Sequence, residues 1–319
     1  DLHSFPTRRS SDLHIEGGRE PVRLLNRDSP ETLFVLQSGL TGSDDSKHPT
    51  HLERFESGRT EYVLGNADEL RVPLTWRSPE GVEVAKTYVF RRGSYRIDLE
   101  YDVRNESGRP WQAASYAQLS RTDPPKETSM FSPESYAFRG PALWDGERYR
   151  KLDIEDDEDR ALSVPVKNAW IAALQHHFVT AVVPPVDAQQ NVTLKADQRQ
   201  FVFATAGPLR TVGPGESTRF TERFFVGPKL QKQLEATGPE LDRVADYGRL
   251  YLLAEPLFSA LEIAHNWVGN WGWAIILVTL LLKLLFYPLS EASGRSMAKM
   301  KALAIWRSEE RRVGKECRS

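Results

Sequence analysis

The sequence predicts a mainly β protein: a large antiparallel β-sandwich, then an amphipathic helix at a membrane surface, then one transmembrane α-helix. Three observations predict this order. Apolar and polar residues alternate through much of residues 14–230, which is the two-residue period of strands. From Gln231 onward, apolar residues instead recur at helical spacing. A long apolar run follows at residues 271–289.

The clearest strand pattern lies in residues 86–105. Apolar side chains occupy every second position, as one buried strand face requires, and they are Tyr95, Ile97, Leu99, Tyr101 and Val103. The glycine-containing residues 92–94 are expected to turn before this strand. Further strands are predicted at residues 33–37, 61–64, 70–76, 170–183, 191–195, 201–204 and 218–226. So many strands across about 220 residues favour one large antiparallel sandwich.

Residues 231–265 change to a helical pattern. Two helices are predicted, at 239–253 and 256–265, with apolar residues at Leu250, Leu253, Leu257 and Leu261. We interpret them as a linker helix and an amphipathic helix lying at the membrane surface. An ordinary helix packed on the sandwich is the alternative.

Residues 266–290 are predicted to cross the bilayer. A spanning helix needs about 20 mostly apolar residues, and Lys283 is the only charge in residues 271–289. Trp267, Trp271 and Trp273 gather at one end and Tyr287 lies near the other, where aromatic rings anchor at headgroup level. Because the basic residues Arg295, Lys299 and Lys301 follow, the C-terminal end is expected in the cytoplasm and residues 14–265 outside it.

The two ends of the chain have the pattern of non-native scars. Residues 307–319 can be encoded by a string that resembles a sequencing-library adapter, and the reverse complement of that string encodes residues 1–13. We therefore expect natural sequence at 14–306, cut at both ends, with an anchor helix upstream. A basic nucleic-acid-binding tail at 307–318 is the alternative.

Removing both scars changes the formal charge from -2 to -4, because residues 307–319 hold five Lys or Arg and three Asp or Glu. A weakly acidic chain predicts no nucleic-acid partner. The one cysteine, Cys317, lies in the C-terminal scar, which excludes disulfides, zinc-thiolate sites and thiol nucleophiles from the natural part.

Other candidate sites are weaker. His176 and His177 fall within a predicted strand, where neighbours point to opposite faces, so they are expected to be structural rather than joint metal ligands. The acidic run at 153–159 lacks the glycine and spacing of a calcium loop and is expected to be a solvated loop. No nucleotide-binding motif or catalytic triad spacing is found, so neither a cofactor nor a metal is expected.

Several motifs together resemble the YidC/Oxa family of membrane protein insertases. They are LFVLQSGLTG at 33–42, KTYVFRRGSYRIDLEYDVRN at 86–105, WIAALQHHFVTAVVPP at 170–185, VGNWG at 268–272, YPL at 287–289 and SMAKM at 296–300. The resemblance covers nearly all of residues 14–306. It implies a periplasmic β-supersandwich at 14–230, linker and interfacial helices at 231–265, a transmembrane helix at 266–290 and the start of a cytoplasmic hairpin at 291–306.

The resemblance also implies a function without a catalysed reaction. A multi-pass protein of the bacterial inner membrane would insert nascent membrane proteins through a hydrated groove, alone or with the Sec translocase, and would meet the ribosome through further cytoplasmic parts. Lys283 takes the place of the basic residue in that groove, where many members carry Arg. An intramembrane charge is functional by default. Alternatively, Lys283 only snorkels to the cytoplasmic headgroups.

Two other functions are compatible with the external domain. The supersandwich fold is shared with sugar mutarotases and carbohydrate-binding domains, so a membrane-tethered glycan module is one alternative. Such an enzyme would need an acid and a base in one pocket, and the sequence cannot place His176 or Glu222 there. A docking domain for the translocation machinery is the other and is compatible with insertion.

Overall fold

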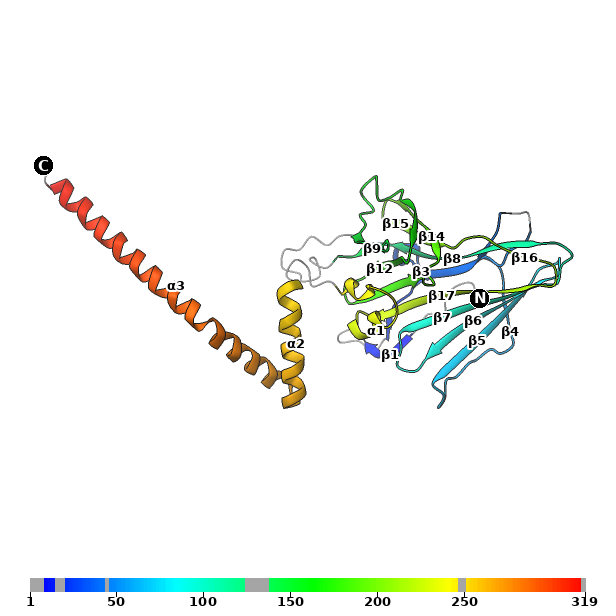
Figure 1. The fold of residues 1–319 in the computed structure, drawn as a ribbon, viewed down its shortest axis with the longest axis horizontal. Coiled ribbons are helices and arrows are strands. Elements are labelled where there is room, and N and C mark those ends of the chain that lie inside the picture. Colours follow the sequence, from blue (N-terminus) through cyan, green and yellow to red (C-terminus); the bar gives the residue numbers. More distant parts are fainter. Residues whose placement is uncertain (1–8, 15–20, 44–45, 124–137, 246–250, 317–319) are drawn as a thin grey trace. The chain divides into compact units, whose positions relative to one another are not determined.

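In a computed structural model of the chain, residues 9–14, 21–43, 46–123, 138–245 and 251–316 are described (Figure 1). They belong to two compact units, one comprising Asp1–Ala245 and the other Asp246–Ser319. The first unit is built mainly of strands, with a few short helical turns, and the described part of the second is built of helices. The predicted order of a β domain followed by helices is confirmed.

The first unit contains a sheet of nine strands. In spatial order they are β10 (Tyr149–Lys151), β9 (Gly140–Trp144), β12 (Trp170–Leu174), β13 (Phe178–Val183), β17 (Ser217–Pro228), β7 (Arg96–Asn105), β6 (Val82–Arg91), β5 (Glu69–Arg77) and β4 (Glu56–Ser57).

The second sheet has six strands. They are β11 (Ser163–Lys167), β14 (Gln189–Asp197), β15 (Gln200–Ala206), β8 (Trp111–Thr122) and β16 (Arg210–Val212), with β3 (Phe34–Thr41) also paired to β8. β1 (Arg9–His14) and β2 (Pro21–Arg23) form a separate pair, and η1 (Pro30–Thr32) is a short 3-10 helix before β3. Every pairing among the described strands is antiparallel.

The main core lies between the two sheets. Strand β7 shows how the sequence produces it, because Ile97, Leu99, Tyr101 and Val103 are all at most 1% exposed while the acidic residues between them face outward. Their partners across the core come from the six-stranded sheet and include Leu36, Leu119, Phe201 and Phe203. Burial of apolar side chains on both sheets contributes roughly 25 cal/mol per Å² of apolar surface. The predicted antiparallel sandwich is therefore confirmed.

The strands of the structure differ from the predicted strands at three places. Residues 61–64 form no strand, since only β4 precedes β5 in this region. Residues 170–183 form two strands, β12 and β13, joined by a tight turn at 175–177. The long strand β8, at the centre of the six-stranded sheet, carries no clear alternation and has no counterpart in the prediction.

Residues 231–245 pack on the outer face of the nine-stranded sheet. They form α1 (Gln231–Glu235) and η3 (Leu241–Val244), and a second apolar cluster joins Leu234, Leu241 and Val244 to Trp170 and Phe225. Within the helix predicted for 239–253, residues 241–244 form a 3-10 turn and residues 251–253 begin a longer α-helix, while residues 246–250 lie outside the described residues. Residues 231–245 are part of the sandwich unit rather than a linker.

Polar contacts fasten the same segment to the sheet. The Trp170 Nε1 donates to the Pro239 carbonyl at 2.9 Å, and the Gln233 side chain accepts from the Tyr95 amide at 3.0 Å. Arg223 Nη1 on β17 donates to the Thr237 carbonyl at 2.6 Å. A charge-assisted hydrogen bond of this length is among the stronger contacts in a protein, so Arg223 is a main attachment point of the segment.

Replacing Arg223 with Ala is expected to loosen residues 231–245. The variant loses the bond to Thr237, which is worth about 2 kcal/mol for a charged donor. Hydrogen exchange should show faster amide exchange in α1 and η3 with little change in β7. Arg219→Ala, on the same strand but 58% exposed and bonded to Asp102, is the matched control. Equal exchange in both variants would contradict the role of Arg223.

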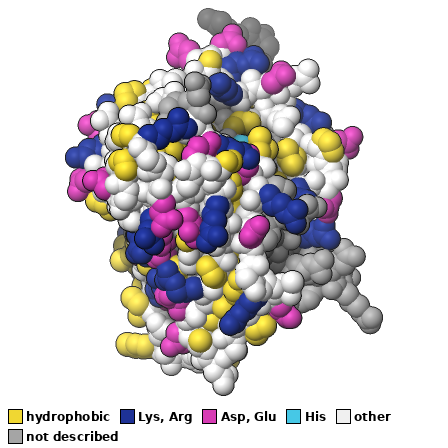
Figure 2. All heavy atoms as spheres, turned by 90° about the vertical axis from the view of Figure 1, so that its right-hand side faces the viewer, with side chains coloured by type: hydrophobic (Ala, Val, Ile, Leu, Met, Phe, Trp, Pro, Cys, Tyr) yellow, Lys and Arg dark blue, Asp and Glu magenta, His cyan; other side chains and the backbone are white. Residues whose placement is uncertain are grey.

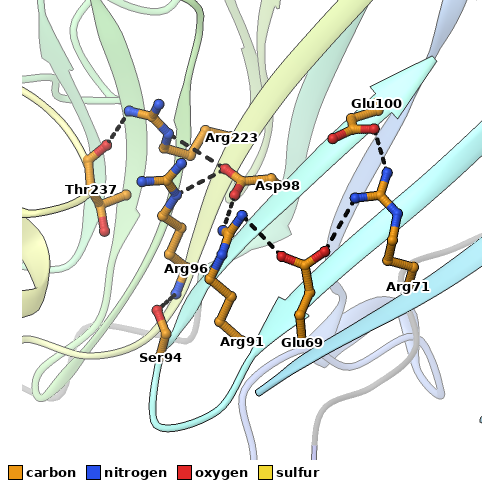
Figure 3. A network of polar contacts seen from close by, with 9 residues as sticks. All are labelled: Glu69, Arg71, Arg91, Ser94, Arg96, Asp98, Glu100, Arg223 and Thr237. Carbon is orange, nitrogen blue, oxygen red and sulfur yellow. Dashed lines mark hydrogen bonds and ion pairs between the residues drawn. The ribbon is translucent and has the colours of Figure 1, made fainter. Parts of the chain in front are cut away.

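The remaining outer face of this sheet carries a network of ion pairs (Figure 3). Arg71 on β5 bonds to Glu69 at 3.2 Å and to Glu100 on β7 at 2.5 Å. Asp98 on β7 contacts Arg91 on β6, and its Oδ1 atom also lies 2.8 Å from the Arg96 Nε. Because these side chains are partly solvated, each pair contributes about 1 kcal/mol or less. The network mainly keeps this uncovered sheet face polar.

Gly42, just after β3, lies where a side chain has no room. A Cβ atom there would come within 2.5 Å of the Gln112 carbonyl and even closer to the His48 ring. That ring stacks on Trp111 at 5.0 Å and bonds to the Gln112 carbonyl at 2.7 Å. Gly42 thus allows residues 48–51 to lie against β8.

Gly42→Ala is therefore expected to destabilise the sandwich by about 1–3 kcal/mol, since overpacking forces the His48 contact to move. Gly58→Ala, at a position with open space around its Cβ, should change stability far less. Urea midpoints of the two variants measure the difference. Equal midpoints would show that residues 48–51 move to accept the added methyl group without a loss of stability.

The second unit consists of α2 (Tyr251–Val268) and α3 (Trp271–Glu316). Pro256 lies inside α2 rather than starting a new helix. The expected boundary at 265/266 also falls inside α2, which continues to Val268. Helix α3 passes without a break through the expected ends at 290 and 306. The non-native origin of residues 1–13 and 307–319 stays a prediction.

Candidate functional site

Helix α3 contains a segment suited to crossing a membrane. Residues Trp271–Met297 form 27 helical residues with a mean hydropathy of 2.0 over the most apolar window. The apolar side chains are exposed, among them Leu280, Leu281, Leu284 and Leu285 at 56–68%. Such a surface on a soluble helix would be costly in water, so lipid is the environment that matches it.

Lys283 is the single charged residue in the first twenty residues of α3. Its side chain is exposed on the helix surface. It lies twelve residues after Trp271, a rise of about 18 Å along the helix. In a hydrocarbon layer of ~30 Å, this places the ammonium group past the middle and nearer the C-terminal side, if the segment enters at Trp271.

Of the four predicted aromatic anchors, two lie at the start of this segment, one lies just before it in α2, and Tyr287 lies ten residues before its end. Trp271 and Trp273 are in the first turn of α3 and are 50% and 62% exposed, and Tyr287 is 64% exposed. Trp267 lies instead in the last turn of α2 and is 89% exposed. Trp271 and Tyr287 are separated by about 24 Å of helix rise, close to the thickness of the hydrocarbon layer.

A two-residue corner joins α2 to α3. Gly269 has a positive φ of 67°, and its amide donates to the His265 carbonyl at 2.7 Å, which ends α2. The Asn270 side-chain oxygen accepts from the Gly272 amide at 2.8 Å and from the Trp273 amide at 3.4 Å, which starts α3. The motif VGNWG therefore encodes a C-cap directly followed by an N-cap.

The sandwich holds an isolated buried acid, Glu222. Its side chain is 3% exposed, and Ser115 Oγ donates to one carboxyl oxygen at 2.7 Å. The other oxygen, Oε2, has no hydrogen-bond partner among the described residues. Burial raises the pKa of Glu222 to about 7, against the smaller opposing effect of the Ser115 bond. Glu222 is therefore largely protonated below neutral pH.

Lys86 is a second buried ionisable group. Its Nζ donates to the Ser38 carbonyl at 2.8 Å and lies 5.2–5.4 Å from the ring centres of Phe55, Tyr88 and Tyr101. Cation–π attraction to the three rings offsets part of the cost of burying the ammonium group. Sequence reasoning missed Lys86 and named Glu222 without being able to place it, because the burial of both side chains depends on which strands meet across the core.

The prediction for His176 and His177 was wrong in its geometry. Both lie in the turn between β12 and β13, and their ring centres are 4.0 Å apart. A turn does not alternate its side chains as a strand does, so the rings come together instead of facing opposite ways. Within the described ranges, no group of three or more His, Cys, Asp or Glu side chains is arranged to hold a metal ion.

The acidic run at 153–159 forms a solvated loop of local turns. Asp153 and Asp156 accept hydrogen bonds from the amides two residues later, and Arg150 bonds to Asp159 at 2.9 Å. A cavity of about 480 Å³ lies nearby, between the β9–β10 hairpin and β11, and includes Asp145, Glu147, Arg150 and Lys167 in its lining. Neither Glu222 nor His176 lines it.

Basic and acidic side chains are intermixed on the molecular face shown in Figure 2. Among the described residues on that face, side chains of one sign do not gather into a large area. This agrees with the small formal net charge of -2 for the whole chain.

Among the described residues, a β-sandwich is followed by one apolar helix long enough to cross a membrane, an order typical of membrane-anchored proteins. Two family models match the chain: the YidC periplasmic domain at residues 13–260 and the 60Kd inner membrane protein at residues 263–305. The chain belongs to the YidC family of inner-membrane proteins.

Two relatives illustrate the match, and both are named membrane protein insertase YidC. The protein from Thioalkalivibrio sulfidiphilus is 44% identical over 314 residues, covering 95% of this chain and 54% of the relative. The protein from Nitrosococcus oceani is 40% identical over 293 residues, covering 91% of this chain and 53% of the relative. The chain thus spans about half the length of the curated relatives that it matches.

Solved structures are more distant. A galactose mutarotase related enzyme from Lactobacillus acidophilus has a TM-score of 0.40 and 11% identity, over 65% of this chain and 87% of that chain. A likeness at this level assigns no activity.

Proposed function

We propose that the chain is part of a membrane protein insertase that places nascent proteins into the bacterial inner membrane and helps them fold. The observation that carries this proposal is the match to the family over both the sandwich and the spanning helix. The relatives named as insertases support it at 37–44% identity. No bond is made or broken in this process, so the protein would not be an enzyme.

Lys283 is the proposed point of contact with substrate. An ammonium group within the hydrocarbon layer costs several kcal/mol unless it reaches water or a partner. A hydrated groove formed with the rest of the insertase would remove that cost, and Lys283 would attract acidic or polar parts of a substrate into it. The substrate's apolar helix then moves into lipid, stabilised by roughly 25 cal/mol per Å² of apolar surface.

The proposed orientation places residues 14–265 in the periplasm and the residues after 290 in the cytoplasm. The basic residues that follow the apolar segment support it, since cytoplasmic flanks are rich in Lys and Arg. Trp267, Trp271, Trp273 and Tyr287 would anchor the segment at the two interfaces. The Sec translocase and the ribosome are the proposed protein partners, and no nucleic acid is expected to bind.

Reconstitution of the full-length protein tests this function. Proteoliposomes that contain it should make the membrane helix of a newly synthesised single-span protein resistant to added protease. Liposomes that lack it set the background. Protection at the background level would refute the insertase proposal.

A sugar-converting function requires an acid and a base that face one cavity. Glu222 is enclosed in the core and His176 lies in a hairpin turn, and neither lines the cavity beside β11. No observation of the described residues favours this function over insertion.

A further inference from the structure

The corner between α2 and α3 is held by three separate contacts. Gly269 takes a left-handed conformation that a side chain would strain, and its amide closes the last turn of α2. Asn270 caps the first turn of α3. The third contact joins the helices directly, because the His265 ring stacks on the Trp271 ring at a centroid distance of 3.9 Å and an angle of 14°.

These contacts restrict where α3 can begin. Without a cap, the first turn of a helix frays, and its start shifts along the sequence. With Asn270 as the N-cap, α3 begins at Trp271. The His265–Trp271 stack also restricts the rotation of α3 relative to α2, since it joins the last turn of one helix to the first residue of the other.

We propose that this corner is a rigid elbow that sets the depth of Lys283 in the membrane, with Asn270 and His265 as positioning residues. Lys283 lies thirteen residues after Asn270, a rise of about 20 Å. A corner held at the outer boundary of the hydrocarbon layer places the ammonium group ~10 Å from the opposite boundary.

The exposed apolar surface of α2 is what would hold the corner at that boundary. Ile263 and Trp267 lie four residues apart and therefore on one face of α2, where they are 59% and 89% exposed. An exposed apolar face of this kind favours a position in the plane of the interface. Because the elbow is rigid, the depth of α2 in the membrane sets the depth at which α3 begins. The depth of Lys283 is then determined by α2 and not by the apolar segment alone. The importance of this depth for activity rests on the proposed insertase function.

The elbow is tested first by its geometry, in the whole chain in lipid nanodiscs with Cys317→Ser. Spin labels at the exposed positions Phe258 and Leu281 report the distance between α2 and α3 by pulsed electron paramagnetic resonance. Asn270→Ala and His265→Ala should broaden the distance distribution at least twofold. Asn270→Asp keeps a capping oxygen and His265→Phe keeps a stacking ring, so both should retain the original width.

The depth is tested by a single label at Leu284, beside Lys283, through its contact with a lipid-soluble and a water-soluble relaxation agent. Asn270→Ala should spread or shift this depth by about one helical turn, roughly 5 Å, and Asn270→Asp should not. In the full-length protein, insertion should then fall at least threefold in Asn270→Ala and be restored in Asn270→Asp.

Unchanged distances in both Ala variants, together with an unchanged depth in Asn270→Ala, would overturn the elbow. A changed depth with unchanged insertion would overturn its positioning role. If the unsubstituted full-length protein itself gives no insertion, the proposed function fails, and the spectroscopic result still decides whether the elbow exists.

Discussion

Replacing Lys283 with Ala in the full-length protein is expected to reduce insertion by about tenfold, which corresponds to the loss of roughly 1.4 kcal/mol of interaction. The reason is that the variant removes the only charge in the first twenty residues of α3 and with it the proposed attraction for polar parts of a substrate. Lys283→Arg keeps the charge and should insert normally. Protease protection of a substrate helix measures all three proteins.

Leu284→Ala is the matched control for this experiment. Leu284 follows Lys283 on the same helix, is 68% exposed, and carries no charge. Its truncation should leave insertion nearly unchanged. Insertion by Lys283→Ala at the level of the unsubstituted protein would mean that the ammonium group only reaches the headgroups and takes no part in substrate transfer.

The second large effect concerns pH and the buried carboxyl of Glu222. Its pKa is raised from 4.5 to about 7 by burial, so the folded state holds its proton more tightly than the unfolded state. The corresponding stability is fully present below pH 4.5 and is lost as the pH rises through 7. A shift of this size corresponds to about 3 kcal/mol. The sandwich should therefore be less stable at pH 8 than at pH 5.

Glu222→Gln should remove most of this pH dependence. The amide oxygen still accepts the bond from Ser115, and the side chain no longer ionises. Urea unfolding of residues 14–245 at several pH values between 5 and 8 measures the slope. Asp157→Asn is the control, because that carboxyl is 95% exposed. If Glu222→Gln and the unsubstituted protein lose stability equally with rising pH, the buried carboxyl is not the cause.

The sequence predicts strands well where one face is buried and the other solvated. Strand β7 was predicted because Asp98, Glu100 and Asp102 face outward between fully buried neighbours. Strand β8 was not predicted, because it is paired with strands along both edges and buries polar as well as apolar residues. Arg121 on β8 donates to the Leu174 carbonyl at 2.7 Å, and Ser115 bonds to Glu222. Buried polar residues of this kind conceal the alternation.

Long-range partners explain the other differences. Ser115 and Glu222 are 107 positions apart, so the local sequence cannot show that they meet. The turn at His176 and His177 contains no Gly, Pro, Asn or Asp, and the surrounding apolar residues therefore read as one strand. In contrast, Gly269 and Asn270 carry a local pattern that could have been interpreted, because Gly ends helices and Asn starts them.

The edge strands of the two sheets affect how readily the domain could pair with other polypeptide chains. The nine-stranded sheet ends in β4 and β10, which are two and three residues long, and β11 at one end of the other sheet contains Pro165. Strand β3 is bonded through its backbone to Asn26 and Pro49 as well as to β8. Short, proline-containing or covered edges resist the addition of foreign strands. The described edges of the sandwich therefore leave little unpaired backbone on which another chain could add a strand and start an aggregate.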